Sequence, residues 1–510
     1  MDVPLSGFGP LAGDTDADVV IIGAGITGVT AALLLKQRGR SVVLLDANAP
    51  GAGETARSTA HVTVVPDARF ATLAARFGKE PASAALKGYA TAIDWIESTT
   101  RGLAIACDFA RVPGHLYCDE TAAQERELER EAEAANELGV AATLVREIPL
   151  PFPVRRALRF ERQAQLHPLR YLEGLLAAVA GDGCSVHGGT RVVQVHDGDP
   201  CRVKTERGTI TCRAVVVAAH VPFTNRWLLH TKLSPHRSYV VAAQTELPEN
   251  IGLCWDLARP YHYWRTARVA GVPLVIVGGG DHRVGEREHA EDSFGGLERY
   301  LAERLGRRAV HFRWSGQIIE PADGLPYVGR NSLSTRIFVA TGYSGNGIAG
   351  GTLGAMVLAD DVLGVASPWG EVFAATRVHP VASAGAVVRE GVAAAKHMLV
   401  DRIRMLPALA VRDLPRGEGR VVHLGGNPLA IYREPLGNLL AVSAVCTHLG
   451  GLVAWNGAER TWDCPCHGSR FGADGCVLNG PAVEPLERRD LADEVGDELE
   501  APSPLVPSTG

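Results

Sequence analysis

The sequence predicts an α/β fold followed by a small all-β domain, and three patterns lead to this prediction. Residues 18–46 read as a strand, a glycine-rich turn, a segment with helical periodicity and a second strand. Residues 190–219 alternate as short strands and end in the apolar run AVVVAA. From about residue 409 the strands are short and punctuated by glycine, with no helical period.

The size and composition of the chain limit the classes of function. A chain of 510 residues is longer than one hydrophobic core normally serves, so we expect two or three domains. A formal net charge of −6 gives no reason to expect nucleic acid as a partner. The N-terminus lacks a signal-peptide pattern, and Asp360 and Asp361 interrupt the apolar stretch 348–365, so we expect no membrane span. Ten irregularly spaced cysteines favour metal binding in a reducing cytoplasm over a disulfide framework.

The first strand–helix–strand unit carries a dinucleotide-binding pattern. Gly23, Gly25 and Gly28 form G-x-G-x-x-G directly after the strand. In order, they permit a sharp turn, close approach of the backbone to a pyrophosphate, and tight packing of the helix on the strand. The start of the helix stabilises phosphate charge, and Asp46 at the end of the second strand can accept hydrogen bonds from ribose hydroxyls.

The glycine pattern alone does not distinguish FAD from NAD, but two other features favour FAD. The segment ending in AVVVAAH and the later RIFVATGYSGNG are expected to return to the same sheet, as in many FAD proteins. The chain also has one G-x-G-x-x-G only that opens a strand–helix–strand unit, since the second match, residues 345–350, is not followed by such a strand. Gly278–Gly280 follow a strand, but the next residues do not begin an apolar-faced helix, so no second dinucleotide site is expected.

Three further segments complete the predicted organisation. The charged segment 120–138 is expected to be a helix with a solvated face outside the core. A helix is expected from just after Asn346 to about Leu363. The sequence then predicts a linker and an Ala/Val-rich helix over 366–408, followed by the small β domain over 409–502.

The N-terminal 365 or so residues resemble the D-amino-acid oxidase and glycine/sarcosine oxidase superfamily. The matching segments are 20–46, 51–61, 313–329 and 338–348, and the last two are the most specific. The resemblance implies a Rossmann-like FAD-binding domain with an interleaved, sheet-based substrate domain, within residues 15–365. The implied FAD-binding parts are about 15–65, 160–230 and 313–365, and the substrate parts are about 66–159 and 231–312.

The same resemblance implies contacts to FAD and a class of substrate. Three residues are implied to lie near the pyrophosphate and flavin: Thr55, Arg57 and Ser58. Four are implied to lie by the pyrimidine end of the flavin, where helix-start amides would stabilise reduced flavin: Gly342, Ser344, Gly345 and Asn346. Family members move a hydride from a carbon bonded to nitrogen, so an amine or amino-acid-like substrate is expected.

Two residues are candidates for the substrate site. Arg265 is suited to pair with a substrate carboxylate, although a surface arginine on a strand is the alternative. His61, in the flavin loop, is a candidate for contact with the ring or for proton transfer, although a structural histidine is equally compatible with the sequence. Tyr261 and Tyr263 are interpreted as packing residues.

The C-terminal domain carries two pairs of cysteine and histidine. Cys446 and His448 form C-x-H, and Cys464 and His467 form C-x-x-H. Two such pairs on glycine-rich loops can grip one compact metal centre, and the spacing alone leaves a tetrahedral zinc site open.

The motifs CTHLG and CPCHGS resemble the two cluster loops of Rieske domains almost letter for letter. This resemblance implies a [2Fe–2S] cluster in which Cys446 and Cys464 bind one iron and His448 and His467 bind the other. The exposed edges of the two histidines are the expected exit for electrons.

Two positions depart from the pattern of respiratory Rieske proteins. Gly451 stands where those proteins have a cysteine, so Cys466 lacks its disulfide partner. Ser469 is present, but Phe471 stands where a tyrosine would donate a hydrogen bond to the cluster region. Hydrogen bonds to the sulfurs stabilise the reduced cluster, so we expect a potential between the dioxygenase and respiratory groups.

The combination of modules leaves three hypotheses. The leading one is an FAD-dependent oxidoreductase that oxidises an amine or amino-acid-like substrate and passes electrons singly through the cluster to an external acceptor. In the second, electrons enter through the cluster and reduce FAD for a reductase or oxygenase reaction. The third is a redox sensor or electron-transfer adaptor without catalysis.

Overall fold

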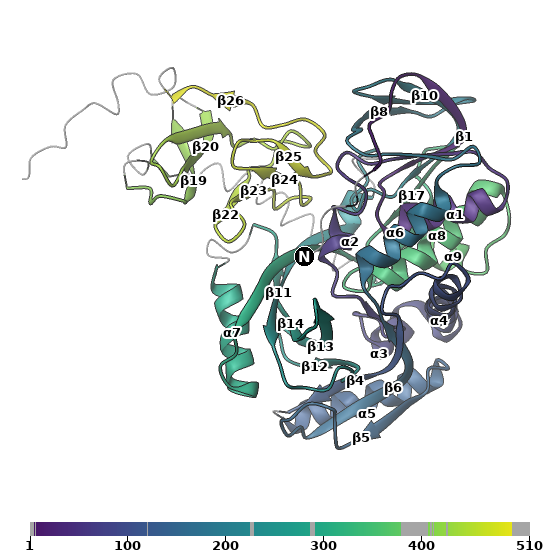
Figure 1. Cartoon of the computed structure of the whole chain (residues 1–510), viewed down its shortest axis with the longest axis vertical. Helices are drawn as coiled ribbons and strands as arrows, with labels where there is room; N and C mark the ends of the chain where they lie inside the picture. The colour runs from purple at the N-terminus through teal and green to yellow at the C-terminus, as the bar shows by residue number, and fades with distance from the viewer. Residues whose placement is uncertain are drawn as a thin grey trace, which may run out of the picture. The chain divides into compact units, whose positions relative to one another are not determined.

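The computed structural model describes residues 5, 7–119, 121–224, 229–285, 291–378, 406–407, 411, 413–424 and 427–491. The chain forms two compact units, residues 1–283 with 292–390 and residues 284–291 with 391–510 (Figure 1). The helix expected in the linker falls outside the described residues. The fold class is confirmed: an α/β fold precedes a strand-rich C-terminal region. The domain boundaries stay predictions.

The first sheet of the first unit has the predicted parallel centre. Its strands in the described residues are β1 (Thr15–Ile22), β2 (Val42–Leu45), β7 (Ser185–His187), β8 (Val192–His196), β9 (Cys201–Thr205), β10 (Thr209–Val217), β16 (Tyr327–Arg330) and β17 (Ile337–Thr341). Their order is β16-β17-β10-β1-β2-β7, and β8 and β9 form an antiparallel extension on β10. β10 and β17 therefore return to the sheet of β1, as expected.

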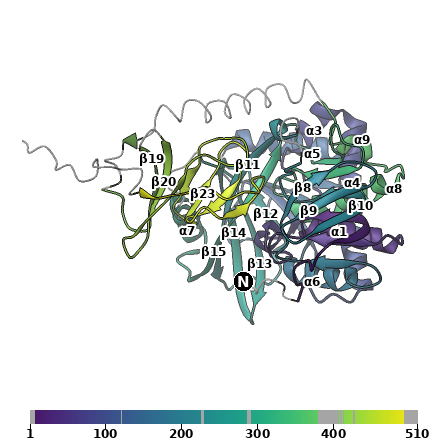
Figure 2. The ribbon, with the colours of Figure 1, turned by 90° about the horizontal axis from the view of Figure 1, so that it is seen from above.

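The sheet is buried on both faces, which explains its near-continuous apolar strands. In β1, Val19 and Ile21 belong to one core cluster, while Val20 and Ile22 belong to the other. Helices α1 (Ile26–Gln37), α6 (Pro168–Val179) and α8 (Gly347–Leu363) contribute to the first cluster. Figure 2 shows α1, α4 and α8 gathered beside β10. The predicted end of α8, near Leu363, agrees with the structure.

The second sheet is mainly antiparallel. Its strands in the described residues are β3 (His61–Val62), β4 (Ala110–Cys118), β5 (Ala142–Val145), β6 (Arg156–Gln165), β11 (Leu233–Gln244), β12 (Leu253–Asp256), β13 (His262–Val269), β14 (Val272–Arg283) and β15 (Val310–Pro321). β15 pairs with β11, and β3 pairs with β6, so both belong to this sheet although the expected boundaries assign them largely to the FAD-binding parts.

The other helices of the first unit are α2 (Glu54–Arg57), α3 (Phe70–Phe77), α4 (Lys79–Gly102), α5 (Ala122–Glu137), α7 (Glu291–Leu305), α9 (Gly370–Phe373) and a 3₁₀ helix (His230–Lys232). The charged segment forms α5, which begins with a capping box between Thr121 and Gln124. Its outer face is solvated, as expected. Its inner face is part of the core, where Glu131 accepts a hydrogen bond from the Phe70 backbone at 2.7 Å.

The second unit contains two small sheets in its described residues. One comprises β18 (Leu406–Pro407), β19 (Gly419–Leu424), β20 (Asn427–Arg433), β21 (Leu439–Ser443) and β26 (Arg488–Arg489). The other comprises β22 (Ala454–Asn456), β23 (Thr461–Asp463), β24 (Arg470–Gly472) and β25 (Val477–Asn479). The loops that carry the Cys/His motifs follow β21 and β23.

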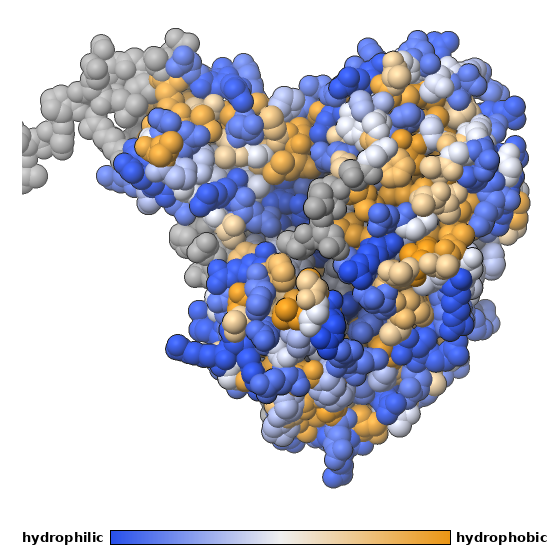
Figure 3. Space-filling model, in the orientation of Figure 1, coloured by the Kyte–Doolittle hydropathy of each residue, from blue (hydrophilic) through white to orange (hydrophobic). Residues whose placement is uncertain are grey.

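The surface is mostly hydrophilic. Figure 3 shows hydrophilic residues over much of one face, interspersed with smaller hydrophobic groups. Within the described part of the chain, no helix combines the length and the apolar character that crossing a bilayer requires.

A buried ion pair holds the segment that joins β15 to β16. The Arg377 guanidinium donates to both carboxylate oxygens of Asp323 at 2.8 and 2.7 Å, and to the backbone carbonyls of Pro326 and Phe373. It also lies over the ring of Tyr327, with 3.9 Å between Cζ and the ring centroid. Asp323 is fully buried, and Arg377 is the cation that pairs with its carboxylate directly.

We expect Asp323→Asn to lower the free energy of unfolding of the first unit by about 3–5 kcal/mol, because it leaves the Arg377 charge buried without its counter-ion. Chemical denaturation followed by circular dichroism measures this change. The control is Glu161→Gln, which breaks an exposed pair with Arg159 and should cost less than about 1 kcal/mol. Equal losses in the two variants would contradict the assigned role.

Candidate functional site

The glycine-rich turn before α1 has the tight packing that the motif predicts. A Cβ at Gly28 would lie 1.9 Å from the Gly23 carbonyl oxygen, and a Cβ at Gly23 would lie 2.5 Å from the Ala218 carbonyl oxygen. Gly23 also has a φ of +106°. Gly25 is the N-cap of α1 and has no side chain with which to cap the helix. The turn therefore presents backbone amides to an anion.

Asp46 and Thr55 hold this turn in place. Asp46 Oδ2 accepts a hydrogen bond from the Ala24 amide at 2.8 Å, and Thr55 Oγ1 accepts one from the Ile26 amide at 3.1 Å. Burial raises the pKa of Asp46, and hydrogen bonds from the Asn48 and Ala24 amides oppose this rise. The contact of Asp46 with a ribose stays a prediction.

Hydrogen bonds hold the loop after α2 in place, both to neighbouring residues of the same segment and to β15. Arg57 donates to the carbonyl oxygens of Ala52 and Gly53, both at 3.1 Å, and Ser58 Oγ accepts from the Ala60 amide at 3.0 Å. Trp314 on β15 donates to the Arg57 carbonyl at 2.9 Å. Arg57 and Ser58 thus shape the loop, and their contacts to FAD stay predictions.

The loop before α8 is fastened in a similar way. The Ser344 amide donates to the Ile319 carbonyl at 3.0 Å, and Asn346 Nδ2 donates to the Thr63 carbonyl at 2.7 Å. Gly342 has a φ of +79°, which favours glycine at this turn. The Gly345 amide donates to Asp67 at 2.6 Å. The structure therefore brings the second group of predicted FAD residues against the segment that follows β3.

The residues present fit FAD. The starts of α1 and α8 lie together, since Thr27 Oγ1 donates to the Tyr343 hydroxyl at 3.2 Å and a Cβ at Gly351 would lie 2.7 Å from Thr27 Oγ1. Neither helix is capped by the side chain of its own N-cap residue. Two neighbouring helix starts suit a long, negatively charged cofactor; the residues at the start of α1 and before α8 would hold it, and FAD would supply redox chemistry there.

His61 lies in a dry, aromatic environment. Its ring centroid is 5.2 Å from that of Tyr263 and 6.4 Å from that of Trp255. Its Nε2 atom is buried and makes no hydrogen bond in the described structure. Burial, with the positive charge of Arg265, lowers the pKa of His61 to about 3. His61 is therefore neutral near pH 7, and its role toward flavin or substrate stays a prediction.

Arg265 is buried, so the interpretation as a surface arginine is wrong. Its Nη1 donates to the carbonyl oxygens of Thr59 and Leu166 at 2.6 and 3.2 Å, and to that of Ala60 at 3.3 Å. These bonds tie the flavin loop to the second sheet. This geometry describes a positioning residue, and pairing with a substrate carboxylate stays a prediction.

The sequence analysis did not identify a polar group next to the two tyrosines of β13. Asp281, on β14, receives hydrogen bonds from Ser238 and Tyr261. The Ser238 and Tyr263 hydroxyls are 3.5 Å apart, and the rings of Tyr261 and Tyr263 are 5.9 Å apart. Both tyrosines are partly buried, and Tyr263 packs against the first core cluster, so their interpretation as packing residues stays a prediction.

The glycines just before Asp281 are a feature of the sequence that could have indicated this polar group. Gly278 faces Tyr263 across the ladder, and a Cβ there would lie 2.0 Å from Tyr263 Cζ. Gly279 has a φ of +141°, and a Cβ there would lie 2.3 Å from the Tyr261 carbonyl oxygen. These glycines make room for the tyrosines and do not bind phosphate.

The two Cys/His loops of the second unit close in the same way. The Gly450 amide donates to the Cys446 carbonyl, and the Gly468 amide donates to the Cys464 carbonyl, both at 2.9 Å. Both glycines have a positive φ, +76° and +79°. Each loop thus folds back four residues after its cysteine, which explains the glycine in each motif.

The four predicted ligands come together as two pairs. The Cys446 and Cys464 thiols are in hydrogen-bond contact, and the ring centroids of His448 and His467 are 5.0 Å apart. No three His, Cys, Asp or Glu side chains of the described residues surround a single ion position. A Cys pair and a His pair fit a binuclear cluster with two protein ligands for each iron.

Two expectations about the cluster loops have different outcomes. Cys466 is buried and forms no disulfide, as expected, and a Cβ at Gly451 would lie 2.5 Å from its sulfur. The Ser469 hydroxyl contacts Cys446 and accepts a hydrogen bond from the Ala482 amide at 3.0 Å.

The expectation of two exposed histidine edges is wrong for His448, which is 6 % exposed because it belongs to the packed loop; His467 is half-buried.

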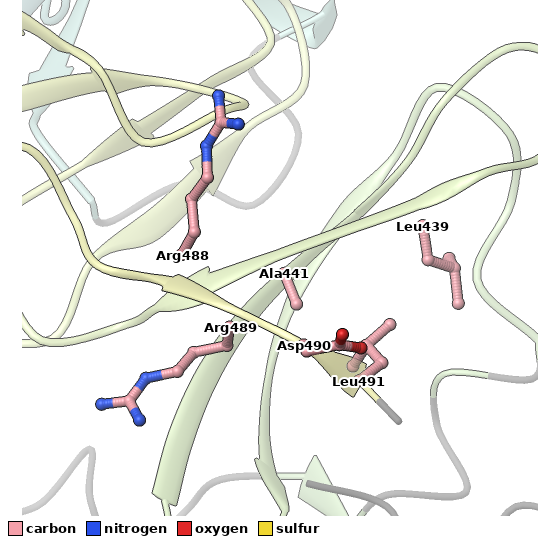
Figure 4. Close-up of a pocket in the computed structure, with 6 residues that line it drawn as sticks. All are labelled: Leu439, Ala441, Arg488, Arg489, Asp490 and Leu491. Carbon is pink, nitrogen blue, oxygen red and sulfur yellow. The ribbon is translucent and has the colours of Figure 1, made fainter. Parts of the chain in front are cut away.

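The second unit also has an open surface pocket of about 460 Å³ on its five-stranded sheet, lined by Leu439, Ala441, Arg488, Arg489, Asp490 and Leu491 (Figure 4). Figure 4 shows the side chains of Arg488 and Arg489 pointing to opposite sides of β26. Their charges do not converge on one position, so we assign no function to this pocket.

Comparisons with known proteins agree with the two units. Residues 18–361 match the family model "FAD dependent oxidoreductase", and residues 404–490 match "Rieske [2Fe-2S] domain". A Bacillus subtilis protein named as a Rieske 2Fe-2S iron-sulfur protein (YhfW) is 32% identical over 491 residues, 96% of each chain. The cytochrome b6-f complex iron-sulfur subunit of Chlorobaculum tepidum is 35% identical over 128 residues, 25% of this chain and 65% of its own. The glycine oxidase structure from Geobacillus kaustophilus has a TM-score of 0.59 at 19% identity, over 71% of this chain and 99% of its own, which shows a shared fold.

We expect Gly28→Ala to lower the FAD content of the purified protein about tenfold or more, because the added methyl group collides with the Gly23 carbonyl and reshapes the turn. The ratio of flavin to protein after gel filtration measures the effect. In the control, Gly102→Ala, the added Cβ meets nothing within 4 Å. Full FAD content in Gly28→Ala would contradict a role of this turn in binding.

We expect Ser469→Ala to lower the midpoint potential of the cluster and Phe471→Tyr to raise it. Each change removes or adds one hydrogen bond near the cluster sulfurs, which corresponds to roughly 20–65 mV for a bond of about 0.5–1.5 kcal/mol. A redox titration monitored by electron paramagnetic resonance measures both shifts. Leu436→Tyr is the control, because it introduces a tyrosine on an exposed turn. It should leave the potential unchanged. A wild-type potential level with respiratory Rieske proteins would refute the intermediate value.

Proposed function

Since this chain belongs to the FAD dependent oxidoreductase family and carries a Rieske [2Fe-2S] domain, we propose that it oxidises an amine or amino-acid-like substrate and passes the electrons singly through the cluster to an external acceptor. When bound, FAD accepts two electrons from a carbon next to nitrogen, and a [2Fe–2S] cluster carries one electron at a time. The fusion of the two supports conversion between two-electron and one-electron chemistry.

One observation supports this proposal most directly. The loop before α8 and the end of β13 converge: the position of a Cβ at Gly345 lies 3.5 Å from the Tyr261 hydroxyl. His61 reaches the same aromatic group through Tyr263. Elements expected to hold the flavin thus meet polar groups of the second sheet, as a substrate site beside a flavin requires.

The residues of this site have distinct parts in the proposed reaction. Arg265 fixes the flavin loop against the second sheet, and His61 is neutral at pH 7 because burial and the charge of Arg265 lower its pKa. Tyr261 and Tyr263 supply hydroxyl groups and aromatic faces for orienting a substrate. In the second unit, His467 is the more exposed of the two cluster histidines and is the proposed exit for electrons. We place the protein in the cytoplasm, and the observation that none of its ten cysteines forms a disulfide supports this location.

The direct test is anaerobic reduction of the purified full-length protein with amines and amino acids. Loss of flavin colour followed by loss of cluster colour supports the proposal. If no amine or amino acid reduces the flavin while reduced ferredoxin does, electrons enter through the cluster. If neither reduces it, the chain is an adaptor without this catalysis.

We expect Cys464→Ser to remove the cluster and keep the flavin reaction. Iron content should fall to near zero, anaerobic flavin reduction by the amine should continue, and turnover with a one-electron acceptor should fall about tenfold or more, because single electrons then lack their carrier. Cys476→Ser makes the same substitution at an exposed thiol outside the cluster loops and should change neither quantity. Undiminished acceptor turnover in Cys464→Ser without iron would refute the proposed route.

A further inference from the structure

A buried ion pair joins the two ends of the second cluster loop. Asp463 precedes this loop and Arg470 follows it, and the two residues face each other across β23 and β24. Arg470 Nε donates to Asp463 Oδ1 at 3.1 Å, and the side chains of Arg470 and Asp463 are 3% and 4% exposed. Since Cys464 follows Asp463 directly and Ser469 precedes Arg470, the pair fixes where the loop begins and ends.

Further polar groups complete a network around this pair. Asp463 also accepts hydrogen bonds from Thr461 Oγ1 at 2.8 Å and from Asn456 Nδ2 at 3.1 Å. Arg470 Nη2 donates to the Glu459 carboxylate and, at 3.2 Å, to Thr461 Oγ1. Two carboxylates therefore share one guanidinium, and hydrogen bonds fix the orientation of all three groups. We call Glu459, Asp463 and Arg470 the charged triad.

The first cluster loop closes without an ion pair at its ends. The same backbone hydrogen bond closes both loops, from the amide of the cysteine to the carbonyl five residues later, at 2.8 Å in the first loop and 2.7 Å in the second. The residues that flank the first loop, Val445 and Leu452, form an apolar bridge. A buried ion pair is often no more stabilising than an apolar pair of similar volume. Loop closure alone therefore does not account for the charged triad.

We propose that the charged triad sets both the geometry and the potential of the cluster: Arg470 positions the second loop through Asp463, and the two carboxylates lower the midpoint potential. Reduction adds one negative charge to a [2Fe–2S] cluster, and a nearby buried carboxylate disfavours that charge. Burial keeps solvent and salt from screening this effect. The inference concerns the cluster alone, so it does not depend on the substrate or on the direction of electron flow.

The test of the effect on potential is Glu459→Gln in the full-length holoprotein, which removes one negative charge and leaves the bond between Asp463 and Arg470 in place. At the wild-type midpoint potential, we expect the ratio of reduced to oxidised cluster to rise about threefold or more, which is roughly 30 mV for a one-electron couple. A redox titration followed by electron paramagnetic resonance measures the ratio. The iron content should equal that of the wild type, because the ends of the loop keep their bonds.

Glu487→Gln is the matched control. Glu487 also pairs with an arginine, Arg489, at 2.8 Å, but its side chain is 69% exposed, whereas that of Glu459 is 19% exposed. The same loss of charge should change the ratio by less than about 1.5-fold, because solvent and salt screen an exposed charge. A wild-type ratio in Glu459→Gln, or an equal rise in both variants, would overturn the effect on potential.

Two variants of Arg470 separate position from charge. Arg470→Gln leaves Asp463 without its guanidinium, so we expect iron loss to a chelator to become about tenfold or more faster and the ratio of reduced to oxidised cluster to fall about threefold or more. Arg470→Lys restores the positive charge and with it the ratio. Lysine lacks the planar fork that reaches Asp463 and Glu459 together, so iron loss should stay faster than in the wild type.

Arg488→Gln is the control for these variants, because its side chain is 78% exposed and its loss should change neither quantity. Iron loss at the wild-type rate in Arg470→Gln would overturn the positioning role. If Arg470→Gln retains no iron while Arg470→Lys does, the positioning role is supported, and Glu459→Gln still decides the effect on potential.

Discussion

The substrate side of the first unit depends on one buried guanidinium. Arg265 leaves the second sheet and donates to carbonyls of Thr59, Ala60 and Leu166, which belong to the flavin loop and to the end of β6. A buried cation is costly unless hydrogen bonds replace its water, and three carbonyl oxygens do so here. The flavin loop is consequently fixed to the same strands that carry Tyr263.

Burial affects several charged groups in this part of the first unit. The Arg265 guanidinium donates its hydrogen bonds to backbone carbonyl oxygens. Burial of His61, together with the positive charge of Arg265, keeps His61 neutral. The charges of Arg57 and Arg237 lower the pKa of Glu54, against the effect of burial. Burial raises the pKa of Asp281, and the charges of Glu320 and Asp67 add to this rise.

Local patterns were sufficient to predict some parts of the site and insufficient for others. Gly23 and Gly28 are fixed by one turn, and Cys446 and His448 lie on one loop, so short motifs predicted their neighbourhoods. Asp281 becomes part of a site only because β13 and β14 pair so that Gly278 faces Tyr263. No periodicity in the sequence indicates how these two strands pair. The sequence also left the role of Arg265 open, because its partners Thr59, Ala60 and Leu166 lie far from it along the chain.

The cluster loops show how a Rieske cage can form without an oxidant. The Gly450 and Gly468 turns close each loop through backbone hydrogen bonds, and the two loops come together with the Cys446 and Cys464 thiols in contact. Gly451 leaves the space in which the Cys466 thiol lies buried and unoxidised. Backbone turns and packing thus bring the two loops together without a disulfide bond.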